Sequence, residues 1–481
     1  MRKGSRQVVL FTIALFMAAQ VAWAAPEPLT AQIGQVKTVQ SAVKNMRYSQ
    51  TQQNVRIVFD VTALPEFTAN LAENPDQLTI DFEGTINKVA VPKLSFNDPF
   101  VSSVKLAEAG EGKQRVTIDL KGLVSYNIFT LTNPNRVVVD IIKNSDQKRE
   151  EQIVPGIKRI SLLRHTQAGM VSSHVLDISP YAGYIVKPVL SNDSIAGLER
   201  LQSMAERTKA IAAVNASYFS SAGEIIGLLK IDGEIISTCP FGRTALGIMP
   251  DGTVIMDQVD YKGSVDLPNG GVVAITGINH ERGPDDLILY NSHYGSMTGT
   301  NTFGSDYLIK DDIVIGIAHS SSAIPLGGFV LSAHGIMEKV MADVKVGDTV
   351  KVTQTLGGEW DKTIHAIGAG PRLIRDGSIL LTSKEEKFPA DITIGRAPRT
   401  AVGVTQDGHI ILLVVDGRQQ QSIGMTLQEL ALSMQQLGAV NAMNLDGGGS
   451  SEMVIGGKIR NKPSDGRERS MGDALILVPQ N

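Results

Sequence analysis

The sequence has little cysteine, few aromatic residues and no excess of either sign of charge. A single cysteine, Cys239, excludes an internal disulfide, so the fold must depend on its apolar core. With 45 basic and 49 acidic residues, the net charge of -4 provides no electrostatic footprint for nucleic acid. Aromatic residues make up only 5% of the chain, which leaves few platforms for stacked bases. We therefore expect no nucleic-acid partner.

The motifs of several common enzyme classes are also missing. No Gly-Lys-Ser/Thr follows a glycine-rich turn, which excludes a nucleotide P-loop, and no Gly-x-Ser-x-Gly indicates a serine hydrolase. The eight histidines are scattered without a His-x-His or His-Glu-x-x-His pattern, so we expect no zinc site and no cofactor. Among them, His280 beside Glu281 is the best acid-base candidate, with a surface histidine as the alternative.

The one apolar run of note lies at the start of the chain. Basic residues within the first six positions precede the apolar residues 8–21, and Ala22-Trp23-Ala24 offers a small-residue cleavage site. The run is short for a membrane span, although an uncleaved anchor is the alternative. We expect residues 1–24 to be a signal peptide, the mature chain to lie in the periplasm or cell envelope, and no stable membrane span to remain after cleavage.

A repeat with a constant offset occupies residues 37–143. The pattern of residues 55–61 recurs at 114–120, and that of residues 73–82 recurs at 132–141. The equivalent residues Asp60 and Asp119, like Asp81 and Asp140, are 59 positions apart. Both copies alternate apolar and polar residues around an Asn-Pro turn, which predicts one all-β sandwich of two related halves. The charged residues 144–154 are expected to form a solvated linker.

This segment resembles the AMIN domain through its Arg- and Asp-containing strand, its Asn-Pro turn and its closing strand, which ends in Asp81 or Asp140. AMIN domains occur in exported proteins of the bacterial cell envelope. The resemblance implies that the segment binds peptidoglycan or an envelope polysaccharide. Solvated charges on a strand face are the alternative interpretation of its arginines and aspartates.

From residue 155 to 480, helical and strand patterns alternate. Residues 198–209 have a helical pattern, and Thr426 with Glu429 forms a capping box that opens a second helix. These patterns predict an α+β domain, a mixed sheet with flanking helices. Hairpins are predicted at the residues that precede a turn glycine, which are Asp232, Asp251, Asn269, Asp376 and Asp407.

An apolar strand ends at Asp446, and three consecutive glycines follow it. Glycines permit positive φ and a close approach of a ligand, and their amides can form an anion-binding nest. Asn444 lies on the same strand face, and Ser450 and Ser451 add hydroxyl groups. Ala-Val-Asn-Ala occurs both at residue 213 and at residue 439, which indicates that Asn215 and Asn444 reach a shared cleft. The alternative is a glycine-rich turn stabilised by an aspartate.

Five motifs in this region occur in the order of the phosphodiester glycosidase family, typified by N-acetylglucosamine-1-phosphodiester α-N-acetylglucosaminidase. They are Asn215-Ala216-Ser217-Tyr218-Phe219, Gly370-Pro371-Arg372-Leu373, Pro398-Arg399-Thr400-Ala401, Asp416-Gly417-Arg418 and Asn444-Leu445-Asp446-Gly447-Gly448-Gly449-Ser450-Ser451. Ala216 and Ser217 replace two glycines of the family pattern, which narrows that loop. The resemblance implies an exported hydrolase that cleaves a sugar-1-phosphodiester at the anomeric carbon, in glycan or exopolysaccharide metabolism.

The same resemblance implies roles for individual residues. Asp446 is the carboxylate at the anomeric carbon, as nucleophile or base, and Asp416 is the candidate second carboxylate, with a hairpin turn as the alternative. Arg467 and Arg469 are interpreted as a solvated charge run, with closure over a phosphate as the alternative. The residues expected to bind the sugar or the phosphate are Asn215, Arg399, Thr400, Arg418, Asn444, Gly447, Gly448, Gly449, Ser450 and Ser451.

Two other functions stay open from the sequence. One is a non-catalytic protein that binds cell-wall or other polysaccharide, and the other is a metal-dependent phosphodiesterase. The grouping of Asp446, Arg399 and Asp416 favours catalysis over binding, because binding alone does not require a carboxylate beside the glycine nest.

Overall fold

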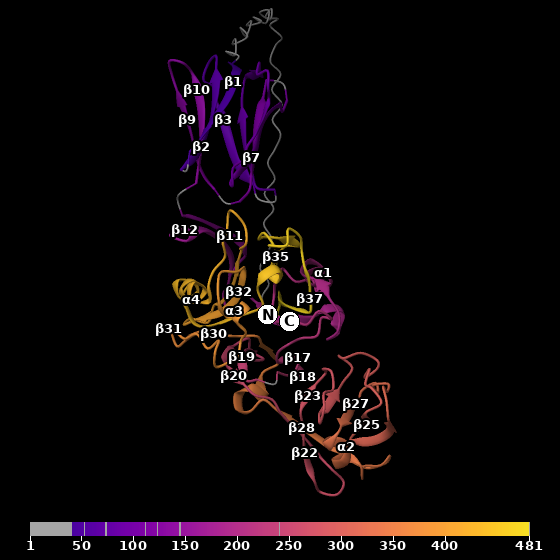
Figure 1. The fold of residues 1–481 in the computed structure, drawn as a ribbon. Helices are drawn as coiled ribbons and strands as arrows, with labels where there is room; N and C mark the ends of the chain where they lie inside the picture. The colour runs from indigo at the N-terminus through magenta and orange to yellow at the C-terminus, as the bar shows by residue number, and fades with distance from the viewer. Residues whose placement is uncertain are drawn as a thin grey trace, which may run out of the picture. The chain divides into compact units, whose positions relative to one another are not determined.

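The N-terminal repeat forms two five-stranded sheets that share one apolar core, in the orders β5-β1-β2-β10-β9 and β3-β4-β8-β7-β6 (Figure 1). The computed structural model describes residues 41–51, 53–72, 75–110, 112–122, 124–143, 146–239 and 241–480, so the predicted signal peptide lies outside the described residues. The strands are β1 Ser41–Gln50, β2 Asn54–Val61, β3 Phe67–Ala72, β4 Gln77–Phe82, β5 Thr85–Asn87, β6 Lys93–Ser95, β7 Val101–Glu108, β8 Gln114–Leu120, β9 Ser125–Leu131 and β10 Arg136–Ile142.

The two copies of this repeat exchange strands. Strand β2 of the first copy pairs with β10 of the second, and β4 of the first pairs with β8 of the second. The register sets Arg56 opposite Asp140 and Arg115 opposite Asp81, and each pair makes two hydrogen bonds of 2.7–2.8 Å. The predicted all-β fold of this segment is confirmed, and its charged residues pair with one another across the two copies.

An eight-stranded sheet follows, in the order β11-β12-β13-β33-β32-β34-β30-β31. Its first strand occupies the segment that was expected to be a linker. The segment is largely exposed, as expected, but it pairs with β12 as a strand. Its charged residues are compatible with this position because an edge strand exposes its side chains to solvent. The strands are β11 Gln147–Val154, β12 Ile157–Thr166, β13 Gly169–Ile178, β30 Arg372–Arg375, β31 Ser378–Ile379, β32 Arg399–Thr405, β33 Ile410–Val415 and β34 Ala439–Asn444.

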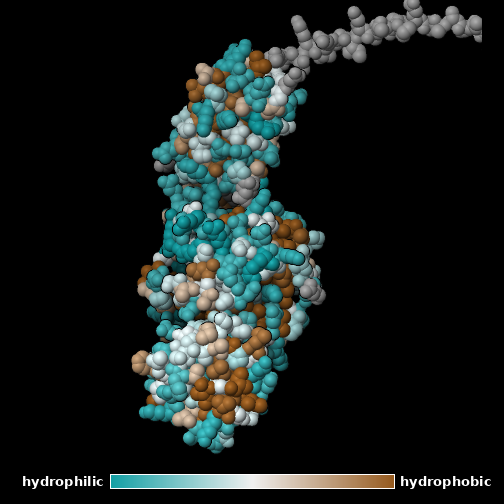
Figure 2. All heavy atoms as spheres, turned by 90° about the vertical axis from the view of Figure 1, so that its right-hand side faces the viewer, coloured by the Kyte–Doolittle hydropathy of each residue, from teal (hydrophilic) through white to brown (hydrophobic). Residues whose placement is uncertain are grey.

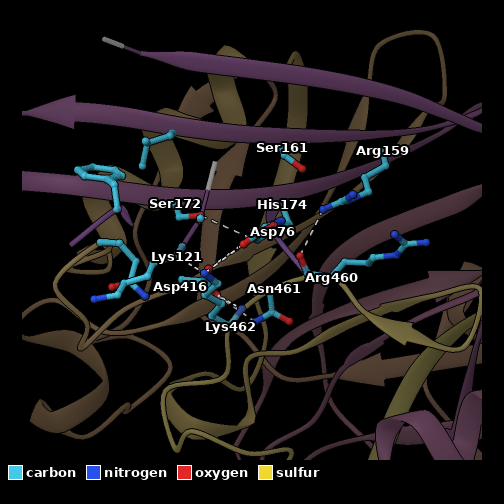
Figure 3. Close-up of a pocket in the computed structure, with 14 residues that line it drawn as sticks. Asp76, Lys121, Arg159, Ser161, Ser172, His174, Asp416, Arg460, Asn461 and Lys462 are labelled. Atoms are coloured by element: carbon cyan, nitrogen blue, oxygen red, sulfur yellow. Dashed lines mark hydrogen bonds and ion pairs between the residues drawn. The ribbon is translucent and has the colours of Figure 1, made fainter. Parts of the chain in front are cut away.

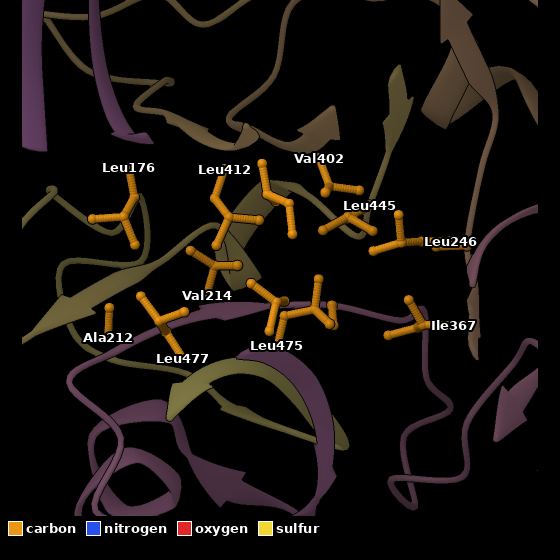
Figure 4. Packing of buried hydrophobic residues seen from close by; sticks show 14 of the residues in the cluster. Leu176, Ala212, Val214, Leu246, Ile367, Val402, Leu412, Leu445, Leu475 and Leu477 are labelled. Carbon is orange, nitrogen blue, oxygen red and sulfur yellow. The ribbon is translucent and has the colours of Figure 1, made fainter. Parts of the chain in front are cut away.

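A five-stranded sheet in the order β14-β38-β16-β35-β36 packs against one face of this sheet. Leu176, Leu412 and Leu445 face Val214 and Leu475 across the interface, and all five are buried (Figure 4). Burial of this apolar surface fixes the ends of β16 and β34 against each other. The strands are β14 Tyr184–Leu190, β16 Ala212–Asn215, β35 Met453–Ile455, β36 Lys458–Ile459 and β38 Asp473–Pro479, with a separate pair formed by β15 Glu199–Arg200 and β37 Ser470–Met471.

A further five-stranded sheet, β18-β17-β29-β19-β20, repeats part of the eight-stranded one. Residues 243–260 align with residues 399–416 at an offset of 156, and nine of the 18 aligned positions are identical. The hairpins that they form have the same register, with Arg243 opposite Val259 and Arg399 opposite Val415. The strands are β17 Leu229–Ile231, β18 Glu234–Ser237, β19 Arg243–Ile248, β20 Val254–Val259 and β29 His365–Gly368.

An insertion of two small sheets, β22-β21-β28 and β23-β24-β27-β25-β26, separates β20 from β29 in the sequence. It carries large exposed apolar side chains, among them Phe303, Leu326 and Ile336, and brown residues gather at the lower end of the face in Figure 2. The strands are β21 Lys262–Asp266, β22 Val272–Ile275, β23 Gly277–Ile278, β24 Leu287–Tyr290, β25 Gly304–Lys310, β26 Ile313–Ala318, β27 Phe329–His334 and β28 Lys351–Thr355.

Helices are few in the described part of the chain, so the expected α+β class with flanking helices needs correction to a predominantly β fold. Strong turn signals close most segments into hairpins, and all five predicted hairpins are present. The predicted capping box of Thr426 and Glu429 is present at the start of α4. The α-helices are α1 Leu201–Arg207, α2 Ile336–Met341, α3 Ala390–Thr393 and α4 Leu427–Gln436, none with the length and apolar character that a membrane crossing needs.

Candidate active site

Asp446 lies just beyond β34, in a loop that two other segments hold in place. Its backbone N–H donates to the carbonyl of Ala216 at 2.8 Å, and the N–H of Leu445 donates to Thr400 at 2.9 Å. The N–H of Gly448 donates to the carbonyl of Pro398, also at 2.9 Å. Because these bonds anchor both sides of Asp446, its carboxylate is fixed relative to β16 and β32.

The carboxyl group of Asp446 is half-buried, and its loss of hydration raises its pKa to about 6. The Ser450 hydroxyl, the Gly447 amide and the charge of Arg469 oppose this shift because they stabilise the ionised form. A carboxyl group with a pKa near 6 is mostly ionised at neutral pH and still accepts a proton readily. Such a group suits a nucleophile or a general base.

The three glycines after Asp446 permit two arginines to approach the backbone. A Cβ atom on Gly448, which has a φ of +63°, would lie 3.4 Å from a guanidinium nitrogen of Arg418. A Cβ atom on Gly449 would lie only 2.0 Å from a guanidinium nitrogen of Arg469. Gly449 is therefore needed for the close contact with Arg469, and Gly448 is needed for its positive φ in the turn.

These two arginines differ in how they are held. Arg418 is exposed, has a φ of +61°, and makes no ion pair within the described residues. Arg469, which was interpreted as part of a solvated charge run, instead reaches the glycine loop and pairs with Asp465 at 2.6 and 2.9 Å. In the described part of the chain, the charge of Arg418 is therefore unpaired beside the glycine loop, where an anionic ligand would bind, whereas the charge of Arg469 is paired with Asp465, which also lies against Gly449.

Asn215 and Thr400 bond to the protein beside Asp446. The amide nitrogen of Asn215 donates to the Asp446 carbonyl at 2.6 Å. Its amide oxygen accepts from the Thr400 hydroxyl at 2.6 Å and from the Glu452 N–H at 3.1 Å. Asn215 therefore joins three segments at the base of the loop.

Asn444 has the opposite character, because part of its side chain lacks a protein partner. Its amide nitrogen donates to the Tyr218 hydroxyl at 2.9 Å, and that hydroxyl donates to the carbonyl of Gly370 at 3.1 Å. The amide oxygen of Asn444 and the hydroxyl of Ser451 are buried without an acceptor or donor among the described residues. Unpaired buried polar atoms of this kind mark places where a ligand or water binds.

Arg399 is buried beneath this region, and its guanidinium bonds to backbone carbonyls. It donates to Met425 and Ile392 at 3.0 Å each and to Gly395 at 3.2 Å. Burial lowers its pKa from the usual range for arginine. These three bonds connect β32 to the segment before it and to the turn that precedes α4.

Asp416 faces a cavity whose lining does not include Asp446 (Figure 3). One carboxylate oxygen accepts from the Asn461 amide at 3.1 Å and the Lys462 N–H at 2.9 Å. The other lies 3.3 Å from Nε2 of His174. The side chain of Asp416 thus fixes the loop that begins at Asn461.

Two buried acids lie beside the loop that the sequence motifs do not mark. Asp473 accepts from the N–H of Ser217 at 2.8 Å, and its second oxygen has no partner among the described residues. Burial, with a smaller effect of the Asp446 charge, raises the pKa of Asp473 to about 7. Burial and Glu468 raise the pKa of Glu452 to about 9. The signal for Asp473 in the sequence is a lone acid at the start of the apolar residues 474–478.

The chain is similar to known proteins in both of its parts. Residues 309–478 match the phosphodiester glycosidase family, and residues 45–127 and 103–172 match the AMIN domain. Over 103 residues it is 38% identical to the N-acetylglucosamine-1-phosphodiester alpha-N-acetylglucosaminidase of Mus musculus, covering 19% of this chain and 20% of that protein. An uncharacterized SPbeta prophage-derived protein of Bacillus subtilis is 40% identical over 88 residues, 18% of this chain and 14% of that protein. The matches therefore span a fifth or less of these two relatives.

A solved structure extends the similarity of fold to most of the chain. A hypothetical protein from Synechocystis superposes with a TM-score of 0.68 at 21% identity, covering 91% of this chain and 80% of that one. At this identity the similarity concerns the fold alone. It includes the N-terminal sandwich as well as the sheets around Asp446, because so much of the chain is covered.

Proposed function

We propose that this chain, which carries a phosphodiester glycosidase domain behind an AMIN domain, hydrolyses a sugar-1-phosphodiester in the bacterial cell envelope. One observation carries the proposal. The half-buried carboxylate of Asp446 lies at the start of a triple-glycine loop against which Arg418 and Arg469 pack. A carboxylate suits the cationic anomeric carbon of the transition state, and guanidinium groups suit the departing phosphate.

The reaction breaks the bond between the anomeric carbon and the phosphate oxygen. Water supplies a hydroxyl group to the sugar and a proton to the medium, and the phosphate leaves as a monoester anion. Asp446 acts either as the nucleophile or as the base that takes a proton from water. The leaving group needs little help from an acid, because phosphate is stable as an anion once its charge is neutralised.

The contacts divide the expected site residues into two groups. The first group has polar atoms that are bonded to protein. Asn215 and Thr400 position the Asp446 loop, and Arg399 connects β32 to the segment before it and to the turn before α4. The second group is assigned to the substrate, and it comprises Arg418, Asn444, Gly447, Gly448, Gly449, Ser450 and Ser451. The Gly448 N–H already donates to Pro398, so Gly448 contributes by its lack of a side chain. We assign Asp473 as the carboxyl group that interacts with Asp446, and Asp416 as an anchor for the loop at Asn461.

The AMIN domain makes an envelope polymer the natural partner of the exported protein. We propose that residues 37–143 bind peptidoglycan or an envelope polysaccharide and thereby hold residues 155–480 near glycan substrates. The pairs Arg56–Asp140 and Arg115–Asp81 lie on the outer faces of the two sheets, where they are available for hydrogen bonds to sugar hydroxyls.

Release of sugar from a UDP-linked or p-nitrophenyl-phosphate-linked α-N-acetylglucosamine tests the activity. Asp446→Asn should reduce kcat by about 1,000-fold or more, since it removes the group at the reacting carbon. Asp343→Asn, at an exposed position in the insertion between β20 and β29, is the matched control and should leave kcat unchanged.

Three results would contradict this proposal. Full activity in Asp446→Asn removes the role of that carboxylate. Glycan binding without hydrolysis of any sugar phosphodiester favours a lectin. Loss of activity with a chelator and recovery with a divalent ion favours a metal-dependent phosphodiesterase.

A further inference from the structure

Arg243 is the counterpart of Arg399 in the second internal repeat. Both open the pattern Arg-Thr-Ala-x-Gly, and both begin the first strand of a hairpin with the same register. The following threonines also act alike, since the Thr244 hydroxyl donates to Glu386 and the Thr400 hydroxyl donates to Asn215, each at 2.6 Å. The two arginines therefore occupy equivalent backbone positions.

Their guanidinium groups have different surroundings. The guanidinium of Arg399 is buried and bonded to three carbonyls. The half-buried guanidinium of Arg243 has no hydrogen-bond acceptor or carboxylate among the described residues, and its Nε atom is buried without a partner. A guanidinium carries five N–H donors in a fixed plane, so that of Arg243 remains available to a ligand.

Aromatic rings fix the position of Arg243. Its guanidinium carbon lies 4.2 Å from the ring centre of Phe388 and 5.8 Å from that of Tyr218. Glu386, two residues before Phe388, holds that loop to β19 through the N–H and hydroxyl of Thr244. The rings stabilise the cation without using its N–H donors.

Tyr218 connects Arg243 to the Asp446 loop. The Tyr218 hydroxyl accepts a hydrogen bond from Asn444, which is two residues before Asp446. Burial and the charge of Asp446 raise the pKa of the Tyr218 phenol, and the charges of Arg399 and Arg243 lower it. The guanidinium of Arg243 and the loop that carries the Asp446 carboxylate thus both lie beside the Tyr218 side chain.

We propose that Arg243 binds the phosphate of the substrate, the role that the sequence motif gives to Arg399. This assignment rests on the proposed function, because a sugar-1-phosphodiester carries its phosphate on the anomeric carbon, at which Asp446 acts. The planar guanidinium donates to two phosphate oxygens, and Phe388 holds it in the required orientation. Arg243 is therefore a residue that determines specificity for phosphodiester over neutral glycosides.

Isothermal titration of inorganic phosphate and of α-N-acetylglucosamine 1-phosphate tests the assignment in the Asp446→Asn protein, which binds without turnover. Arg243→Gln should weaken binding of both probes by about 10- to 100-fold, as expected for lost charge-assisted hydrogen bonds. Arg243→Lys should give an intermediate loss of affinity, because lysine keeps the positive charge but lacks the planar pair of N–H donors. The control Arg200→Gln, at an exposed arginine, should bind like the parent.

The outcomes separate this inference from the function. Unchanged binding in Arg243→Gln, or no binding of phosphate by the parent protein, overturns the role of Arg243 even if the wild type hydrolyses sugar phosphodiesters. Binding that depends on Arg243, without hydrolysis of any sugar phosphodiester, supports the anion site and overturns the proposed function. If Arg243→Gln does not fold, the titrations are made with Arg243→Lys and Phe388→Leu instead. Unchanged affinity for phosphate in both of these variants overturns the role of Arg243.

Discussion

Replacement of Asp473 by asparagine should make the protein more stable above pH 7 and leave its stability near pH 4 unchanged. The side chain is 1% exposed, and only one of its oxygens has a hydrogen-bond donor, the N–H of Ser217. Asparagine keeps an oxygen for that N–H and removes the charge. The variant therefore tests the ionisation of a buried carboxyl group with little change in packing.

The expected gain in the free energy of unfolding follows from the raised pKa of Asp473. Burial and the charge of Asp446 raise the pKa of Asp473 from 3.8 to about 7. Between these values the folded protein binds more protons than the unfolded chain, so the free energy of unfolding falls as pH rises. At about 1.4 kcal/mol per pH unit, the native state loses at most about 4 kcal/mol by pH 8. Asp473→Asn avoids this loss.

Urea unfolding of wild type and Asp473→Asn at pH 4, 6 and 8 measures the difference. The gap in the free energy of unfolding should open with rising pH and reach its full size above pH 7. In an Asp446→Asn background the gap should be smaller, because the charge of Asp446 contributes to the raised pKa. A gap of the same size at all three pH values refutes the reasoning.

Two other perturbations separate structural residues from functional ones. Arg399→Ala should lower the free energy of unfolding, measured in urea, by about 3 kcal/mol or more, since it leaves three carbonyls without a donor. Arg418→Ala should change that free energy by no more than about 0.5 kcal/mol. Equal losses in the two variants would contradict the structural role of Arg399. Gly449→Ala should displace Arg469, because the new Cβ lies 2.0 Å from its guanidinium. Sugar release should then fall by about 10-fold or more, and wild-type kinetics would show that Arg469 is not needed.

The sequence predicted features that depend on nearby residues. Hairpins follow from Asp-Gly or Asn-Gly, and the start of α4 follows from the spacing of Thr426 and Glu429. The N-terminal sandwich was predicted from its repeat. Its exchange of strands was not, because a repeat does not reveal which strands of the two copies pair.

The hydrogen-bond partners of Asp416 and Arg399 lie on segments that are distant in the sequence. Asp416 is bonded to the loop at Asn461, 45 positions later, and Arg399 is bonded to the carbonyl of Met425. Neither partner has a sequence signature, since the Asn461 amide is one of many in the chain and almost any residue offers a backbone carbonyl. Both helices expected in residues 155–480 are present, as α1 and α4, but strands make up most of this region, so the α+β class overstated the share of helix.

The second internal repeat places two arginines, Arg243 and Arg399, at the same motif position. In β19 and β29, Ala245 pairs with Gly368, and at the equivalent positions of β32 and β34, Ala401 pairs with Asn444. Gly370 therefore corresponds to Asp446, so one copy supplies the carboxylate and the other supplies only a carbonyl. The copies also differ in their arginines, because backbone carbonyls surround Arg399 whereas aromatic rings surround Arg243. Under the assignments proposed above, the copy that contains β34 contributes the Asp446 carboxylate, and the copy that contains β19 contributes the guanidinium of Arg243 as a phosphate ligand alongside Arg418.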